Sequence, residues 1–527
     1  MSVPSRTSVL IAGGGPVGLT LSALLSRYGV DHFLVEARPT TSRHPKARGI
    51  SARSMEIFRR MGLEDAVREA GLPASQVFFY RGRDLVDPDF VRTGLAHRPS
   101  DGEPEHTLSP GLICSQDVLE PLLLRHAREL AGDRVRSGTR LVSFTDDGRG
   151  TDAVVEDVAS GSRHRVRADW LVGCDGTGST VRTGAGIAME GPTGLGRFLS
   201  VRFEAPLGAT VADRASASYF LTAPGSGGFM AVDNDRHWIY QHPLAPDAEP
   251  APDLTDRDHL IRLVREAAGI PDLDVTVRDT MTWRMDARLA DTYRRSHVLL
   301  AGDAAHAIPP TGGHGMNTGI GDADNLAWKL AAVTAGYASE ALLDSYGAER
   351  RPLARRIIDI STDNARHRTA YRIDDELLLT AAYRSTAVLA GPDADAAGPS
   401  TLDPTGYHPG CAPGRRAPHV RLTGGEPGTA STLDLIGPGF TLLTTADSPA
   451  WRQQAETAAR AGIPVVARAL VTGTRQEADP GRWDRLCGTP EPRAAVLVRP
   501  DGHIAWCASD PGDTPLLPVL RSLLSAP

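Results

Sequence analysis

The first forty residues combine two short apolar runs with one amphipathic stretch. Residues 8–15 (SVLIAGGG) form an apolar run that ends in glycines, and residues 31–36 (DHFLVE) form a second one. Between them, leucines recur at helical spacing along residues 16–28, and Gly29 follows. This order predicts two parallel strands that are joined by a crossover helix.

Helical and strand-like patterns then alternate up to the middle of the chain. Residues 50–70 have a helical pattern, and residues 115–131 form a strongly amphipathic stretch. Ser115 stands at the N-cap position of the second stretch, and Gly132 follows its end. Alternating residues around 139–172 predict further strands.

The pattern changes between about residues 185 and 290, where few long helical periods occur. Strand-like segments appear at 198–204, 227–232 and 237–242, so we expect an inserted β-rich layer. A buried apolar strand follows at 297–301, and after a glycine-rich loop a helix is expected over about 316–335.

The last part of the chain begins after a stretch that is dense in Gly, Pro, Ala and Asp, which suggests a linker. Beyond it, residues 431–527 show the periodicity of a βαβ unit. The expected elements are strands 439–444, 463–470, 494–499 and 503–507 and helices 450–461 and 514–524.

Charge and cysteine usage exclude several classes of function. The 527-residue chain has a net charge of −7, which gives no basic field for nucleic acid. Its five cysteines are scattered and contain no CxxC pair, which argues against a disulfide framework or a metal site and fits a reducing compartment. The N-terminus lacks a signal-peptide pattern, so we expect a cytoplasmic protein. The uncharged run from Val9 to Ser26 is interrupted by glycines and Pro16, so no membrane span is expected.

The run Gly13-Gly14-Gly15-Pro16-Val17-Gly18 carries the first chemical signal, because it fits GxGxxG. Gly13 permits a tight turn, Gly15 lets the backbone approach a pyrophosphate, and Gly18 lets the helix pack closely. The helix N-terminus then presents free N–H groups to the phosphates. Glu36 ends the second strand, where a carboxylate can accept hydrogen bonds from a ribose diol. Together these features predict a dinucleotide site without choosing between FAD and NAD.

Two later motifs favour FAD over NAD, because they resemble the motifs of a known family. Residues 170–182 read WLVGCDGTGSTVR, and residues 298–317 read VLLAGDAAHAIPPTGGHGMN. With the GxGxxG unit, their order and separation resemble the group A flavoprotein aromatic hydroxylases, the superfamily of para-hydroxybenzoate and phenol hydroxylases. The nearest likeness is to the polyketide hydroxylases of actinobacteria, and it covers nearly the whole chain.

The resemblance implies an α/β fold with three parts. A discontinuous Rossmann-like FAD-binding domain is expected to carry an inserted β-sheet substrate domain, and a thioredoxin-like domain without CxxC is expected to follow a linker. The implied ranges are 1–75, 107–182 and 291–385 for the FAD-binding domain, 76–106 and 183–290 for the substrate domain, 386–410 for the linker and 411–527 for the last domain. Without paired cysteines the last domain is expected to serve structure or dimer contacts.

Several FAD contacts carry over from the family. The resemblance assigns Asp303 to the ribityl chain, and it assigns Asp175 to FAD and reductant binding, although a helix N-cap is the competing interpretation of Asp175. It places Lys46, Arg48 and Gln116 near the adenosine, diphosphate or ribityl region. The loop and helix start expected at the flavin pyrimidine edge contain Pro309, Gly315, Met316 and Asn317.

The implied activity is that of an FAD-dependent monooxygenase that consumes NADPH or NADH and O2. It would hydroxylate a polycyclic aromatic substrate through a flavin C4a-hydroperoxide. A Baeyer–Villiger or ring-rearranging oxygenase on the same scaffold is one alternative, and a flavoprotein reductase or binding protein is another. Tyr240, His242 and Arg284 are candidates for assisting loss of a phenolic proton, although each is also an ordinary packing or surface residue.

Overall fold

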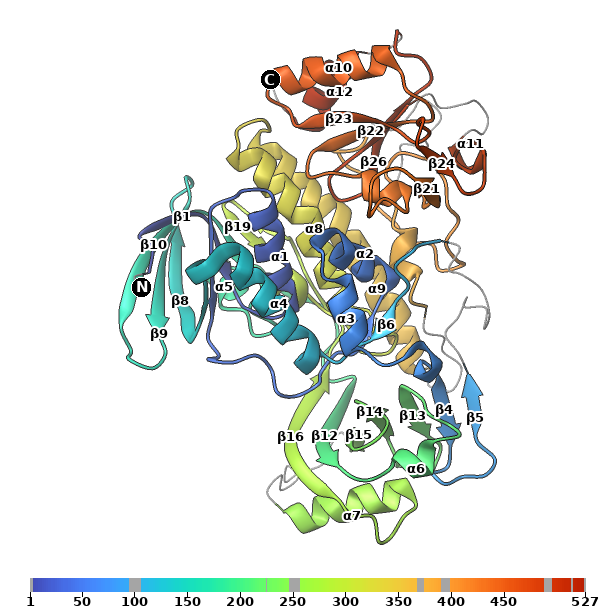
Figure 1. Ribbon diagram of the computed structural model, residues 1–527. Coiled ribbons are helices and arrows are strands. Elements are labelled where there is room, and N and C mark those ends of the chain that lie inside the picture. Colours follow the sequence, from blue (N-terminus) through green and yellow to red (C-terminus); the bar gives the residue numbers. More distant parts are fainter. Residues whose placement is uncertain are drawn as a thin grey trace.

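Three parts are stacked along the long axis of the molecule in the computed structural model (Figure 1). The C-terminal residues lie at the top, a parallel sheet with its helices lies in the middle, and a second sheet lies at the bottom. The structure describes residues 3–93, 106–223, 225–245, 256–366, 374–389, 399–487, 495–512 and 515–525.

The central sheet begins with the strand, helix and strand that the sequence predicts. β1 (Arg6–Ala12) leads into α1 (Pro16–Arg27), and β2 (His32–Glu36) pairs in parallel with β1. The sheet has the order β18-β19-β10-β1-β2-β7, with β8 and β9 attached beside β10. The other strands are β7 (Val135–Ser137), β8 (Thr139–Asp146), β9 (Thr151–Asp157), β10 (Arg163–Gly173), β18 (Arg294–Arg295) and β19 (Val298–Leu300).

Of the helices of this part, α4 and α8 pack directly against α1. The prediction of one helix over 50–70 is wrong in one respect, because Gly62 takes a left-handed φ of 76° and ends the first of two helices. Ser115 stands at the N-cap of α4 as predicted, although its side chain makes no capping hydrogen bond. The helices are α2 (Ala52–Met61), α3 (Glu64–Ala70), α4 (Gln116–Ala131), α5 (Thr180–Gly184), α8 (Gly315–Thr334) and α9 (Asp344–Arg366).

The lower sheet has seven strands in the order β16-β12-β15-β14-β13-β4-β5. Its outer face is covered by α7 (Arg257–Ala268), whose Leu260 and Val264 share a buried cluster with sheet residues such as Tyr219 and Trp238. The strands are β4 (Phe79–Gly82), β5 (Val91–Thr93), β12 (Gly196–Glu204), β13 (Ser218–Leu221), β14 (Gly228–Ala231), β15 (His237–Leu244) and β16 (Thr276–Met285). We call this the β-rich domain.

The C-terminal part has the predicted order of strands and helices. β22 and β23 are parallel and are joined by α10, whereas β25 and β26 add antiparallel strands, as in a thioredoxin-like fold. The elements are β22 (Phe440–Thr444), α10 (Pro449–Arg460), β23 (Val465–Ala469), α11 (Arg482–Cys487), β25 (Ala495–Val498), β26 (Ile504–Ala508) and α12 (Leu516–Leu523).

One expectation about the cysteines is corrected here. Cys411 and Cys487 form a disulfide across 76 residues, with their Cα atoms 4.7 Å apart. The spacing in the sequence gave no sign of it, because the chain fold alone brings these two positions together.

Among the described residues, no helix is long and apolar enough to cross a membrane.

Candidate active site

The loop between β1 and α1 is shaped by steric limits at its glycines. Gly13 has a φ of 108°, and a Cβ there would lie 2.3 Å from the Cys174 carbonyl oxygen. A Cβ at Gly18 would lie 2.0 Å from the Gly13 oxygen, whereas one at Gly15 would meet nothing within 4 Å. Gly15 caps α1 without a side-chain hydrogen bond, and Pro16 begins the helix. The first turn therefore keeps N–H groups available for an anion.

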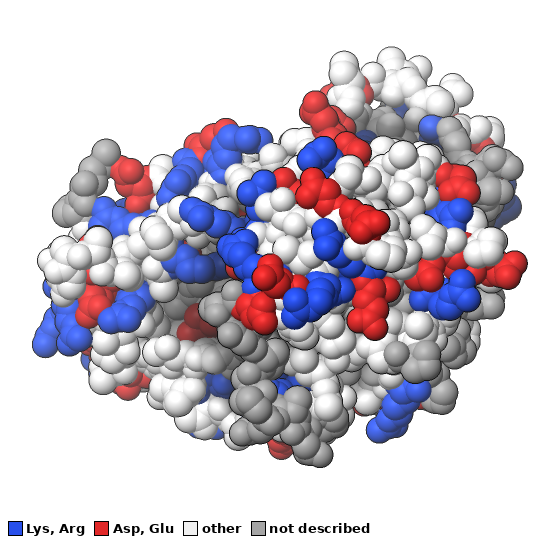
Figure 2. All heavy atoms as spheres, turned by 90° about the horizontal axis from the view of Figure 1, so that it is seen from below, with Lys and Arg blue, Asp and Glu red and all other residues white. Residues whose placement is uncertain are grey.

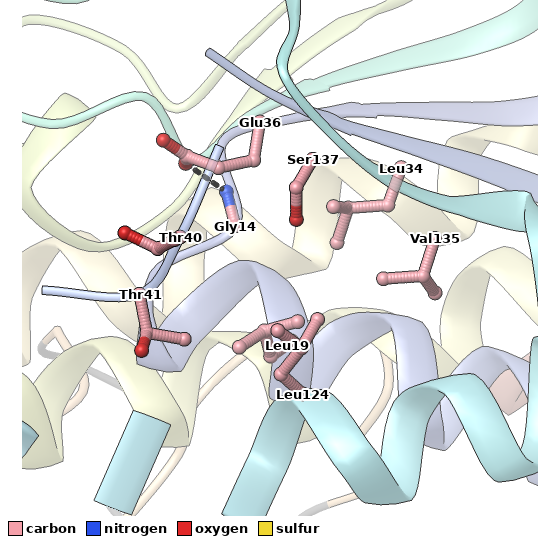
Figure 3. A pocket seen from close by; sticks show the side chains of 9 residues that line it. All are labelled: Gly14, Leu19, Leu34, Glu36, Thr40, Thr41, Leu124, Val135 and Ser137. Atoms are coloured by element: carbon pink, nitrogen blue, oxygen red, sulfur yellow. Dashed lines mark hydrogen bonds between the residues drawn. The ribbon is translucent and has the colours of Figure 1, made fainter. Parts of the chain in front are cut away.

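Glu36 closes a small pocket beside this loop (Figure 3). Its carboxylate accepts hydrogen bonds from the backbone N–H of Gly14 at 2.7 Å and from the backbone N–H of Arg38 at 2.9 Å. Burial alone would raise the pKa of Glu36, but hydrogen bonds from Arg38 and Gly14 lower it below the usual value. The carboxylate is therefore charged at neutral pH and can accept from a diol. The pocket is also lined by Leu19, Leu34, Thr40, Thr41, Leu124, Val135 and Ser137.

Asp303 lies in the loop after β19, next to the first turn of α1. A Cβ at the neighbouring Gly302 would lie 2.9 Å from a Val17 methyl group. The Asp303 side chain is accessible to solvent, yet enough protein surrounds it that desolvation raises its pKa. Among the described residues it has no hydrogen-bond partner. The charges of Lys46 and His306 lie near enough to this carboxyl to offset the desolvation in part.

A buried ion cluster behind Asp303 holds that loop in place. Asp322 of α8 accepts hydrogen bonds from the Gly302 N–H at 3.1 Å and from Arg350 Nε at 2.8 Å, and its Oδ2 lies 2.6 Å from His306 Nε2. The sequence analysis did not single out Asp322 or Arg350. The signal that could have found Asp322 is a polar residue on the buried face of a predicted helix.

The start of α8 follows the same loop along the chain. His314 caps the helix without a side-chain hydrogen bond, and a Cβ at Gly315 would meet only Ile308 at 3.9 Å. Both polar atoms of the Asn317 side chain form hydrogen bonds with the protein. Its Oδ1 accepts from Ser51 N at 2.9 Å, and its Nδ2 donates to Gly49 O at 2.8 Å. Its side chain thus fixes the helix start. Met316 packs at the edge of the core, and Pro309 is buried in the preceding loop.

Asp175 and Gln116 are both held by neighbouring protein groups. The Asp175 carboxylate accepts from Ser179 Oγ and from Val181 N, whereas the N-cap of α5 is Ser179, which accepts from Arg182 N. The backbone N–H of Gln116 donates to Ala47 O at 2.8 Å, which ties the start of α4 to the loop after β2.

Arg48 contacts the β-rich domain. Its guanidinium donates to the carbonyl oxygens of Ala217 and Ala231 at 2.8 and 2.6 Å and to Ser218 Oγ at 2.7 Å. The geometry therefore gives this side chain a role at the domain interface.

These features fit an extended FAD molecule. Glu36 lies where a ribose diol would bind, the first turn of α1 where phosphates would bind, Asp303 where polyol hydroxyls would bind, and the α8 N-terminus where an electron-rich ring edge would bind. The unpartnered Asp303 carboxyl and the open space at Gly15 are the two observations that a bound group would explain.

Comparisons with known proteins agree with this arrangement. Residues 6–361 match the family described as FAD binding domain, and residues 410–527 match the family described as aromatic-ring hydroxylase, C-terminal. The chain is 38% identical to a putative polyketide hydroxylase of Streptomyces halstedii, over 96% of this chain and 94% of that protein. It is 35% identical to the aklavinone 12-hydroxylase RdmE of Streptomyces purpurascens, over 98% and 99% of the two chains.

A solved structure points the same way. The flavin-dependent monooxygenase PieE, in complex with FAD and substrate, superposes with a TM-score of 0.91 at 31% identity over the full length of both chains. The chain belongs to the FAD-dependent aromatic-ring hydroxylases. It is therefore an FAD-dependent monooxygenase that uses NAD(P)H as co-substrate, with a small molecule and O2 as the other reactants.

In this hydroxylase, strand alternation places the three catalytic candidates from the sequence on the face of the β-rich sheet that α7 covers. Tyr240 is 2% exposed and packs in the cluster beneath α7, where burial raises its pKa to about 12. His242 neighbours it, with Nδ1 3.2 Å from the Tyr240 hydroxyl. Arg284 is exposed and pairs with Asp286 at 2.8 Å. None of the three lies on the face of the sheet that meets the FAD-binding domain, so none enters the proposal below.

The opposite face of the β-rich sheet faces the FAD-binding domain. Ser200 of β12 lies on it, 2.7 Å from His44 of the loop after β2, and Ser218 of β13 lies on it against Arg48. We call it the inner face. Strand alternation places Phe198 and Trp283 on the inner face, and their rings stack with centroids 4.5 Å apart. Both rings are only half-buried although they point toward another domain, so they border accessible space.

Proposed function

We propose that this hydroxylase acts on a polycyclic phenolic substrate of the aromatic polyketide class. The observation that carries the proposal is the half-buried aromatic pair Phe198–Trp283 on the inner face, the side of the β-rich sheet that meets the FAD-binding domain. A flat ring system would stack on such a pair. The solved aklavinone-11 hydroxylase, in complex with FAD and aklavinone, supports the same class, with a TM-score of 0.85 and 32% identity.

The protein's own groups divide the work between binding and exclusion of water. Glu36, the α1 N-terminus and Asp303 would hold FAD, which supplies the activation of O2 when it is bound. The inner face would orient the substrate ring and, with the stretch around His44 and Arg48, keep water from the reacting atoms.

Product analysis tests the proposal. The FAD-loaded enzyme is incubated with NADPH, ¹⁸O2 and aklavinone, and the product is analysed by mass spectrometry. We expect incorporation of one labelled oxygen with an intact carbon skeleton. Reductant consumption without labelled product, across a panel of polycyclic phenols, would contradict the substrate class.

A variant tests the binding role of Asp303. Asp303→Ala removes the unpartnered carboxyl, so we expect FAD retention after gel filtration to fall at least about tenfold, which corresponds to the loss of one or two charge-assisted hydrogen bonds. Asp286→Ala serves as the control, because Asp286 pairs with Arg284 at the surface of the other domain.

A more extensive oxygenation is the second candidate. The chain is 37% identical to the tetracenomycin B2 monooxygenase-dioxygenase of Streptomyces olivaceus, over 96% of both chains. Incorporation of more than one labelled oxygen would favour it.

We also propose that the enzyme is cytoplasmic and assembles as a homodimer. β23 is an edge strand of its sheet and Val466 on it is 43% exposed, and an open edge can pair with a second copy. Light scattering of the purified protein tests the assembly, and a monomer at all concentrations would contradict it.

A further inference from the structure

Arg350 of α9 joins two segments that lie on opposite sides of it. On one side, its Nε donates to Asp322 Oδ1 at 2.8 Å and its Nη2 donates to the Thr318 carbonyl oxygen at 2.9 Å. On the other side, its Nη1 donates to the Tyr383 hydroxyl at 2.9 Å. Asp322 and Thr318 belong to α8, whereas Tyr383 lies beyond the end of α9. The rigid, planar guanidinium is therefore oriented by acceptors from both segments.

Asp322 continues the link to the loop after β19. Its Oδ2 accepts from the Gly302 N–H at 3.1 Å and lies 2.6 Å from His306 Nε2. These two residues flank Asp303, and we call residues 302–306 the Asp303 loop. Burial alone would raise the pKa of Asp322, but His306 and the guanidinium lower it below its usual value. The loop is therefore held by a charged acceptor at both of its ends.

Tyr383 is held from the other side by the C-terminal part. Its ring lies against the His503 ring, with the centroids 4.1 Å apart. Its backbone N–H donates to the Gly414 carbonyl oxygen at 2.8 Å, and the Gly414 N–H donates to the Ile504 carbonyl oxygen at 2.7 Å. A Cβ at Gly414 would lie 2.1 Å from the Tyr383 carbonyl oxygen, so the two segments are in direct contact. Residues of the C-terminal part thus set the position of the Tyr383 hydroxyl.

The side chains in this series of contacts are all buried. Asp322, Arg350, Tyr383 and His503 are each at most 3% exposed. Solvent is therefore not at hand to replace a partner that is lost, and a displaced group leaves its neighbour without a hydrogen bond. Figure 1 shows α8 and α9 below the C-terminal part, so the contacts cross from one part of the molecule to another.

We propose that Tyr383 is a positioning residue through which the C-terminal part holds the Asp303 loop in the conformation that binds FAD. The proposal rests on the assignment of Asp303 to FAD in the proposed function. Tyr383 acts through other residues, because its hydroxyl orients Arg350 and Arg350 orients Asp322. Asp322 in turn fixes the backbone of Gly302, next to Asp303. The C-terminal part, which has no CxxC pair, thereby takes part in cofactor binding.

The competing role for Tyr383 is packing between the C-terminal part and α9. Tyr383→Phe separates the two roles, because phenylalanine keeps a ring against His503 but offers no acceptor to Arg350 Nη1. A residue that only packs would leave the binding of FAD unchanged in this variant. A positioning residue would not, because the buried guanidinium loses one of the acceptors that orient it.

The matched control is Tyr407→Phe. The Tyr407 hydroxyl also accepts from a buried arginine, since Arg416 Nη1 donates to it at 2.8 Å. Arg416, however, pairs with Glu56 of α2 and not with the Asp303 loop. Each variant therefore removes one tyrosine acceptor from one buried arginine, and only Tyr383→Phe removes it from an arginine that is joined to that loop.

The first test measures how fast FAD leaves the full-length, FAD-loaded protein. Each protein is diluted, and free FAD is collected by ultrafiltration at intervals and quantified by its absorption. We expect release to be about threefold to tenfold faster in Tyr383→Phe, which is the size of one hydrogen bond, and unchanged in Tyr407→Phe. Release from Tyr383→Phe at the wild-type rate would overturn the proposal. An equal rise in both variants would also overturn it, because it would reflect a general loosening of the C-terminal interface.

The second test combines Tyr383→Phe with Asp303→Ala in the same assay. If Tyr383 acts by placing the Asp303 carboxyl, the double variant should release FAD no faster than Asp303→Ala alone, because the group to be placed is gone. Effects that multiply in the double variant would overturn the coupling and leave Asp303 as an FAD contact. Release from Asp303→Ala at the wild-type rate would instead contradict the assignment of Asp303 in the proposed function, and the proposal with it.

Discussion

The two domain interfaces of this hydroxylase are built from different chemistry. The C-terminal domain is joined to α8 and α9 by buried charges, where Glu349 accepts from Arg499 at 2.6 and 2.9 Å and from Lys329 at 2.8 Å, all fully buried. The β-rich domain is joined through His44 and Arg48, which meet hydroxyl and carbonyl oxygens.

The difference concerns how each interface tolerates movement. A buried ion cluster is stable only in one geometry, because any separation leaves charges without partners in a poorly polarisable interior. Hydrogen bonds to carbonyl and hydroxyl groups can be exchanged for bonds to water at a smaller cost. We infer that the C-terminal domain is fixed to the FAD-binding domain, and that the β-rich domain has more freedom to adjust around a substrate.

The largest effect is expected from opening the charged interface. Glu349→Gln leaves the buried charge of Lys329 without its carboxylate and leaves Arg499 with Asp501 alone, so we expect a loss of about 3–5 kcal/mol in the free energy of unfolding. Urea unfolding at pH 7, followed by fluorescence, measures it. A loss below about 1 kcal/mol, the range of exposed pairs, would show that the cluster is not a fixed joint.

A smaller and more local effect is expected at the other interface. Arg48→Met removes three hydrogen bonds to β13 and β14, and it also removes a charge whose pKa burial has lowered to about 10. We expect a loss of about 1–3 kcal/mol. Limited proteolysis should show faster cleavage in the β-rich domain with unchanged protection of the C-terminal domain. Equal loss of protection in both would contradict the contrast between the two interfaces.

Acid should weaken the C-terminal interface as the pH falls below about 6.5. Burial lowers the pKa of His503, which packs on Tyr383 at the C-terminal interface, from 6.5 to about 4. The unfolded chain therefore binds a proton at this histidine first as the pH falls, and stability is lost between pH 6.5 and 4. At pH 5 this amounts to about 2 kcal/mol. Urea titrations at pH 7.5 and pH 5 should show that drop in the wild type and a smaller one in His503→Gln.

The smallest effect is expected at the surface. Basic and acidic side chains lie next to one another across the face seen in Figure 2. The pair between Arg278 and Glu204 is of this exposed kind, with 51% of the Arg278 side chain accessible. Arg278→Ala should leave the midpoint of thermal unfolding unchanged within error, because solvent screens the pair. A clear shift would mean that ion pairs stabilise this protein regardless of burial.

Local patterns predicted the strand, helix and strand that carry the proposed nucleotide end of the site. The turn at Gly13 and the carboxylate of Glu36 follow from one strand, one helix and the next strand, so short-range rules suffice. The split of the predicted helix 50–70 was missed because an isolated glycine inside a helical pattern is often tolerated.

The substrate side could not be derived in the same way. Alternation along 237–242 separates two faces of a strand, but both faces of this sheet are covered, so the pattern does not tell which one meets the cofactor. Tyr240 therefore looked as suitable as Gln241, its neighbour on the inner face. Contacts such as His44 to Ser200 and Glu349 to Arg499 join positions more than a hundred residues apart, and no local rule reports them.

The stretch from His44 to Ser54 contacts both the sheet that is proposed to face the substrate and the helix start that is proposed to face the cofactor. Its first residues meet the β-rich sheet, and its last ones accept or donate hydrogen bonds at Asn317, where α8 begins. A shift of this stretch would therefore move its contacts with the β-rich sheet and with the start of α8 together. The spacing between the inner face and that helix start depends on one short segment of the chain.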